Sequence, residues 1–424
     1  MQAPALTLHS AWLRNRVAEL GLRQWWLAEQ VGVDRKTVMR WVNGQVRSIQ
    51  PANARVLAGV LGCRVDEMLL AEPAAELAGP EDQRAAGLAL ATSRLLERLG
   101  PVGEWDVAER LIRASAVPDL PLHVLGRLYH QLCVACWRQD KLDEAARHNA
   151  AALDIAARCG DKALRADALG SRANLCFWRG EVPSALAAWH EALTLAAWLE
   201  PPQRGGLHSN LGAALAEIGD AGAGRAELLL ALACFEDGGT PMQCSITRGH
   251  LAALALGEGD LAAAEIQTQR CAALARRGDY RRGMAHATLL GAELSARRGD
   301  AAAALAALDE ALAAYAAQGI DDALNHSVQA RVLRLAGQPA QAIAAARAAL
   351  ALATHLPMEQ ALAWRELAHA QGAHGDAPAA LASAQAAADI YRRCGAPRAA
   401  QAAVSGPHVT ACPHPPLAAA GATR

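Results

Sequence analysis

Most of the chain follows one repeating pattern of small and apolar positions. Between residues 84 and 394, a turn residue recurs every 37 to 40 positions. In nearly every unit, small residues lie seven positions before the turn, five after it and twelve after it. The turn residues are Gly103, Asp140, Gly180, Gly219, Gly259, Gly299, Gly337 and Gly375. The pattern predicts an all-α domain of about eight helix pairs, with small side chains at the helix contacts.

The first 70 residues follow a different pattern, centred on the segment QWWLAEQVGVDRKTVMRWVNG, Gln24–Gly44. Ala28 is small, as a close helix crossing requires, and Gly32 supplies a left-handed turn between two helices. Asp34 is a suitable N-cap for the second of these helices. The apolar residues of the segment are expected to pack in a small helical core. They are Trp25, Trp26, Leu27, Val31, Val33, Val38 and Trp41.

This spacing resembles the helix-turn-helix of the Cro/phage-repressor (XRE-like) family. The resemblance covers about 65 residues, from Ser10–Leu20 through Pro51–Leu61 to the segment that ends at Leu69. It implies a five-helix DNA-binding domain over residues 1–70, with double-stranded DNA as the partner and the second helix of the pair in the major groove. By position, the base readers would be Arg35, Lys36, Met39 and Arg40, and the phosphate contacts would be Gln24, Asn43 and Arg47.

The repeat pattern resembles the tetratricopeptide repeat, most clearly at its Gly-Asp turns and at Trp189. The resemblance implies a right-handed superhelix over residues 84–394, whose concave face binds a ligand. Near one end, the inward positions are Arg127, His130, Trp137, Arg138, Asp167, Asn174, Phe177 and Trp178. Near the other end they are His286, Glu293, Arg297, Arg331, Arg334, Arg365 and His369. Aromatic side chains followed by arginines suit an extended peptide with an acidic or carboxylate terminus.

The order of the two domains resembles the bacterial regulators of the Rgg/PlcR/NprR type, which sense short signalling peptides in quorum sensing. The resemblance implies a homodimer in which a ligand in the repeat groove alters DNA binding. The last repeat, Ala361–Cys394, is poor in charge and is the expected dimer surface, because a solenoid end has an apolar face to cover. Two alternatives stay open. One is a repeat scaffold that binds a protein partner while its helix-turn-helix serves docking or antagonism. The other is an interaction protein that no longer contacts DNA.

Charge divides the chain in the same way. Residues 1–70 hold nine Lys/Arg and five Asp/Glu, a net charge of +4, whereas the remaining residues hold 32 and 37, a net charge of −5. A small basic segment attached to a larger acidic one is typical of a nucleic-acid-binding domain beside a domain that does not bind nucleic acid.

No catalytic or phosphate-binding motif is present, so no enzyme activity and no cofactor or metal are expected. Cys133 and Cys136 form a CxxC in the middle of an expected helix, where core packing is favoured over a redox switch. The sequence has no run of 18 apolar residues and no signal peptide, which favours a cytoplasmic protein with no membrane contact. Residues 71–83 are expected to form a linker and residues 395–424 a disordered tail.

Overall fold

The computed structural model describes residues 6–8, 10–43, 46, 48–63, 65–68, 80–93, 95–100 and 103–405. The chain divides into two compact units, residues 1–86 and 87–424. The second unit therefore starts slightly later than the expected beginning of the repeats at residue 84. The expected linker, residues 71–83, lies largely outside the described residues. It is wrong for residues 80–83, which belong to helix α6, Pro80–Thr92.

Short helices build the described part of the N-terminal unit. They are α1 (Ser10–Glu19), α2 (Gln24–Val31), α3 (Arg35–Val42), α4 (Pro51–Leu61) and α5 (Val65–Met68). The unit also contains an antiparallel strand pair that the sequence does not predict, β1 (Leu6–Thr7) with β2 (Ser48–Ile49). As expected, Gly32 has the left-handed conformation between α2 and α3, with φ of 74°.

The core of this unit contains most of the residues expected there. Leu27, Val31, Val38 and Trp41 are all buried, and Trp26 and Val33 are partly buried. The Trp41 Nε1 atom donates a hydrogen bond to the Ser48 carbonyl oxygen at 3.1 Å, so its ring is fixed inside the unit. The expectation is wrong for Trp25, whose side chain is 51% exposed on α2.

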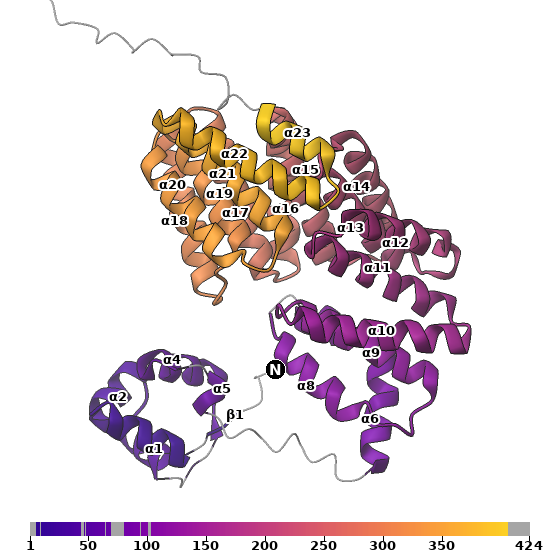
Figure 1. Ribbon diagram of the computed structural model, residues 1–424. Helices are drawn as coiled ribbons and strands as arrows, with labels where there is room; N and C mark the ends of the chain where they lie inside the picture. The colour runs from indigo at the N-terminus through magenta and orange to yellow at the C-terminus, as the bar shows by residue number, and fades with distance from the viewer. Residues whose placement is uncertain are drawn as a thin grey trace, which may run out of the picture. The chain divides into compact units, whose positions relative to one another are not determined.

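The second unit is a stack of helix pairs that follow one another along the chain (Figure 1). The helices that precede each turn are α7 (Leu95–Leu99), α9 (Leu122–Trp137), α11 (Lys162–Trp178), α13 (Pro201–Glu217), α15 (Pro241–Glu258), α17 (Arg281–Arg297), α19 (Ala323–Leu335) and α21 (Pro357–His374). Those that follow each turn are α8 (Trp105–Ser115), α10 (Leu142–Cys159), α12 (Val182–Thr194), α14 (Ala221–Glu236), α16 (Leu261–Arg277), α18 (Ala301–Ala316), α20 (Pro339–Leu352) and α22 (Ala377–Arg393).

The turn residues explain why each helix ends and the next begins. All eight turn residues have positive φ, between 59° at Asp140 and 91° at Gly375. In the Gly-Asp turns the aspartate then caps the second helix; the carboxylate of Asp300, for example, accepts a hydrogen bond from the backbone N–H of Ala303 at 3.0 Å. One dipeptide therefore stops one helix and starts another.

The small residues lie where the helices touch, which confirms the repeat register. The column five positions after the turn is buried throughout and consists of Ala108, Ala145, Ala185, Gly224, Ala264, Ala304, Ala342 and Ala380. The crossing of α13 and α14 shows why size matters. A Cβ atom added to Gly212 would lie 2.8 Å from the Gly224 carbonyl oxygen, too close for a side chain without displacement of the backbone.

The C-terminal helices return to the middle of the repeat unit and pack against it. A further helix, α23 (Pro397–Ser405), follows α22 (Figure 1, yellow). The backbone N–H of Val182 donates a hydrogen bond to the Cys394 carbonyl oxygen at 3.2 Å, and Arg398 forms an ion pair with Asp220. One hydrophobic core contains residues of α11–α13 together with residues of α21–α23. We call this contact between α21–α23 and α11–α13 the seam.

The seam corrects two expectations. Residues 397–405 form a helix with Ala399, Ala400 and Ala403 buried, so the expected disordered tail is wrong for these residues, while residues 406–424 lie outside the described residues. The last repeat, Ala361–Cys394, packs on α11–α13 and on α23. Its apolar face is covered by the chain itself, so the structure does not offer that face as the expected dimer surface.

Candidate nucleic-acid and ligand-binding sites

One face of α3 carries the expected base-reading residues. Arg35, Lys36 and Arg40 are exposed, and the Met39 side chain is 40% exposed. The opposite face, with Trp41, packs in the core. Three cationic side chains therefore project into solvent from a helix whose orientation is fixed by its buried face.

The start of α3 is fixed by its cap. The Asp34 carboxylate accepts hydrogen bonds from the Thr37 hydroxyl at 2.6 Å and from the Thr37 backbone N–H at 2.9 Å. These bonds hold the pKa of Asp34 below its ordinary value. Asp34 is therefore charged at neutral pH and stabilises the first turn of α3, where Arg35 and Lys36 lie.

The expected phosphate contacts are only partly described. Gln24 begins α2 and is half-buried, whereas Asn43 is exposed and forms the C-cap of α3. Arg47 lies outside the described residues. In the sequence, Gln24 is the first residue of the helix pair and Asn43 the last, as the helix-turn-helix resemblance implies.

In the repeat unit, the inward residues of α9 already have partners within the chain. Arg127 is exposed and its Nη2 atom lies 3.7 Å from Asp161 Oδ2. His130 Nε2 lies 3.1 Å from Ser171 Oγ, and burial lowers the pKa of His130, so the ring is neutral at pH 7. The Arg138 guanidinium lies 4.7 Å from the ring centroid of Trp137.

The inward residues of α11 divide between core and surface. Asn174 and Trp178 are half-buried, as a groove residue should be. Phe177 is only 7% exposed and forms edge contacts with Trp178 in the hydrophobic core, so its expected place in the groove is wrong. The Asp167 carboxylate accepts a hydrogen bond from Gln203 at 2.7 Å.

Near the C-terminal end, Arg331 of α19 forms a buried ion-pair network instead of facing solvent. Its Nη1 atom lies 3.1 Å from Glu293 Oε2, and its Nη2 atom lies 2.7 Å from Glu366 Oε1. Glu293 and Glu366 are 2% and 3% exposed. Burial alone would raise the pKa of Glu366, but the charges of Arg331, Arg365 and His369 lower it to about 2. Arg331 therefore already has two carboxylate partners.

Arg334 and Arg365 lie beside this network with hydrogen-bonding capacity left over. The Arg334 Nε atom is buried and has no hydrogen-bond partner among the described residues. Burial lowers the pKa of Arg334, as expected for a cation without an adequate counter-charge. Among the described residues, Arg365 makes two long contacts, 3.5 Å to the Tyr391 hydroxyl and 3.8 Å to Glu366. Together the two guanidinium groups form the part of the expected groove that is best able to bind a carboxylate.

A second charged cluster in the repeat unit was not expected from the sequence. Arg282 Nη2 lies 3.0 Å from Asp322 Oδ2. Burial, together with the nearby carboxylates of Asp322 and Asp140, raises the pKa of Glu359 to about 7. These residues come from segments far apart in the chain, and their charges interact in the folded repeat unit. The sequence feature that could have indicated this cluster is Asp140, an aspartate at a turn position that is glycine in the other repeats.

The CxxC residues pack in the core, as expected. Cys133 and Cys136 are 1% and 0% exposed and belong to one small hydrophobic cluster on α9 and its neighbours. Burial raises the pKa of Cys133 to about 12 and that of Cys136 to about 11. A protonated, buried thiol reacts slowly with oxidants, which favours core packing over a redox switch.

Comparison with solved structures gives the fold of the repeat unit. The Rap protein complexed with competence and sporulation factor aligns with a TM-score of 0.52 and 12% identity, over 76% of this chain and 96% of that one. In fold, the repeat unit resembles tetratricopeptide-like superhelical repeat proteins. No family model matches the chain, and no curated protein sequence matches it either.

Two further structures align with lower scores. A tetratricopeptide repeat protein from Parabacteroides merdae has a TM-score of 0.40 and 18% identity, over 63% of this chain and 93% of that one. PlcR from Bacillus thuringiensis, in complex with the peptide PapR7 and DNA, has a TM-score of 0.35 and 12% identity, over 62% of this chain and 93% of that one.

Within the described part of the chain, no helix is long and apolar enough to cross a membrane.

Proposed function

We propose that this chain is a sequence-specific, DNA-binding transcription regulator whose repeat unit binds a peptide or other small effector that alters DNA binding. The observation that carries the proposal is the exposed cationic face of α3. Arg35, Lys36 and Arg40 extend from a capped helix that follows a three-residue turn. This arrangement is what an XRE-like helix-turn-helix uses in the major groove. The net charge of +4 over residues 1–70 favours the approach to phosphates.

Recognition would depend chiefly on the first turn of α3. An arginine at this position can donate two hydrogen bonds to O6 and N7 of guanine, and we assign this role to Arg35. A single small domain rarely binds DNA specifically at physiological salt, so we infer a homodimer on a two-fold symmetric operator. The seam covers the apolar end of the repeats, so the dimer contact lies elsewhere on the chain.

The first test changes Arg35 to alanine. We expect the binding free energy on the true operator to weaken by about 1–3 kcal/mol, because one bidentate base contact is lost, while binding to random DNA changes little. Mapping of genome-wide occupancy supplies the operator, and mobility shifts at fixed salt measure both affinities. Arg55→Ala, which removes an exposed arginine of α4, is the matched control and should leave the ratio of the two affinities unchanged. An Arg35→Ala variant with the operator affinity of the unaltered chain would contradict the assignment.

The effector would bind in the groove through its carboxyl terminus. The Rap structure, which has this fold, was solved with competence and sporulation factor, and this supports a ligand in the repeat unit as the effector. Within this chain, Arg334 and Arg365 supply two guanidinium groups with unused donors beside a network that is already neutralised. A terminal carboxylate would satisfy the buried Arg334 Nε and accept bidentate hydrogen bonds.

The second test uses a random heptapeptide library with free carboxyl ends and the same library with amidated ends. We expect the full-length chain to retain peptides from the first library only. Arg334→Gln should lower the affinity of a selected peptide roughly 10- to 100-fold, the range for a hydrogen bond to a charged group. Arg276→Gln, on the exposed surface of α16, is the matched control. Equal retention of free and amidated peptides would contradict a carboxylate site.

An alternative function is docking of a protein partner by the N-terminal unit. It is favoured by Trp25, a large aromatic side chain that is 51% exposed on α2. Exposed tryptophans are common anchors in protein interfaces. A mapping experiment that finds no discrete occupied sites would favour this alternative over transcription regulation.

A further inference from the structure

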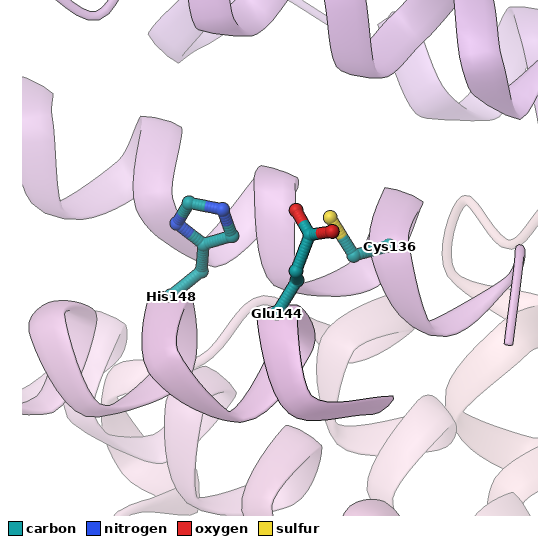
Figure 2. A group of neighbouring side chains, drawn as sticks. All are labelled: Cys136, Glu144 and His148. Carbon is teal, nitrogen blue, oxygen red and sulfur yellow. The ribbon is translucent and has the colours of Figure 1, made fainter. Parts of the chain in front are cut away.

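Two adjacent helices bring a thiol, a carboxylate and an imidazole together on α9 and α10. Glu144 and His148 lie four residues apart and therefore on the same face of α10, and Cys136 faces them from α9 (Figure 2). The Cys136 Sγ atom, a carboxylate oxygen of Glu144 and a ring nitrogen of His148 all lie within 4.8 Å of one another. Cys136 is buried, whereas Glu144 and His148 are half-buried.

The three donors are those that zinc prefers. Zinc binds thiolate sulfur at about 2.3 Å and imidazole nitrogen or carboxylate oxygen at about 2.0–2.2 Å. In a tetrahedral site these bond lengths place the donors about 3.3–3.7 Å apart. Movement of each donor by less than about 1 Å, within reach of small side-chain torsions, would bring the three atoms to that spacing.

The neighbours of the cluster support its geometry. The ring of His148 stacks on Tyr129, with centroids 5.9 Å apart, and this contact orients the imidazole. An imidazole that is held in one orientation needs less rearrangement to coordinate a metal ion.

A cation already lies at this place. The Arg113 guanidinium of α8 donates to Glu144, and its Nη2 atom lies 3.8 Å from Cys136 Sγ. Arg113 has a second partner, because its Nε atom lies 2.7 Å from Glu109 Oε1. Arg113 can therefore leave Glu144 and keep one carboxylate partner when another cation arrives.

We propose that Cys136, Glu144 and His148 form a binding site for zinc or a similar divalent transition-metal ion, with water as a fourth ligand. Binding replaces Arg113 at Glu144 and converts the Cys136 thiol to a zinc thiolate. One S–H bond breaks, one Zn–S bond forms, and one proton passes to solvent for each ion bound. Because Arg113 belongs to α8 and Glu144 to α10, the exchange removes an ion pair between consecutive repeats.

The test uses the reduced full-length chain with zinc chloride in competition with a chromophoric chelator, and cobalt chloride as a spectroscopic probe. We expect one zinc ion per chain, a thiolate-to-cobalt absorption band and release of one proton per ion at pH 7.5. Cys136→Ser should abolish the band and the proton release. His148→Gln should abolish competitive zinc binding. Circular dichroism on each variant confirms that the repeat unit is folded.

Two further variants make the result specific to this site. Cys159→Ser removes an exposed thiol at the end of α10 and should leave zinc binding unchanged. Arg113→Gln removes the competing cation and should tighten zinc binding roughly two- to fivefold, as for loss of a partly exposed ion pair. Unchanged zinc affinity in both Cys136→Ser and His148→Gln would overturn the proposal. So would weaker binding in Arg113→Gln, because the ion would then not lie where the guanidinium lies.

Discussion

Replacing Arg331 with methionine should lower the free energy of unfolding by about 3–5 kcal/mol. The side chain of Arg331 joins Glu293 and Glu366, whose carboxylates are almost completely buried. Methionine fills similar volume but removes the cation that the two carboxylates share. Glu293 keeps its ion pair with Arg297 at 2.8 Å, whereas Glu366 keeps only a 3.8 Å contact with Arg365. A buried carboxylate without a close counter-ion is costly. Chemical denaturation of the full chain measures the change. Arg347→Met, on the exposed surface of α20, is the matched control and should change stability by less than about 0.5 kcal/mol.

The pH dependence of the free energy of unfolding tests the same ion-pair network independently. The pKa of Glu366 in the folded chain, about 2, lies below its ordinary value of 4.5. The group therefore stabilises the fold above pH 4.5, and this contribution is lost as the pH falls from 4.5 toward 2. The Arg331→Met variant should lose less stability across that window than the unaltered chain. Parallel curves for the two proteins would contradict a network in which Arg331 is the principal partner.

A second large loss of stability is expected for Tyr391→Ala, about 3–5 kcal/mol. Tyr391 is fully buried on α22 and belongs to the hydrophobic core that α21–α23 share with α11–α13. Truncation to alanine leaves a cavity in that core and weakens the seam. Denaturation measures the loss, and hydrogen exchange should show faster exchange in α11–α13 as well as in α22, because both sides of the seam lose the contact.

Tyr391→Phe separates packing from hydrogen bonding at the seam. The phenyl ring fills the same space but cannot bond to Glu217, which accepts from the hydroxyl at 3.3 Å, or receive the long contact from Arg365. We expect a loss of only about 0.5–1.5 kcal/mol. A phenylalanine variant as unstable as the alanine variant would show that the hydroxyl, and not the ring, holds the seam.

Local features of this fold were predictable because they depend on neighbouring residues. A glycine needs no tertiary partner to adopt positive φ, and an aspartate caps the helix that follows it, so the turns at Gly299 and Gly375 are evident from the chain alone. The same holds for the α2–α3 turn at Gly32. The face of α3 that carries Arg35 followed from the resemblance to the XRE-like helix-turn-helix.

Features that depend on distant contacts were not predictable in this way. Whether an array of repeats closes is set by the sum of small rotations between consecutive pairs, and no single residue encodes that sum. For this reason the sequence predicted a disordered segment where α23 lies. Glu293 and Glu366 are identifiable as glutamates on expected helices, but their burial beside Arg331 depends on three helices that only the folded chain brings together.

The seam also constrains how this chain can change in length. An open solenoid gains or loses whole repeats with little penalty, since each repeat contacts only its neighbours. Here the backbone N–H of Val182, just after the third turn of the array, meets the Cys394 carbonyl oxygen, and Arg398 meets Asp220, just after the fourth turn. Deletion or duplication of any helix pair between Gly219 and Gly375 would displace α21–α23 from their contacts with α11–α13. The seam therefore fixes the number of helix pairs between its two sides. We expect sequences related to this one to vary in their side chains and in the length of their turns, and not in the number of repeats.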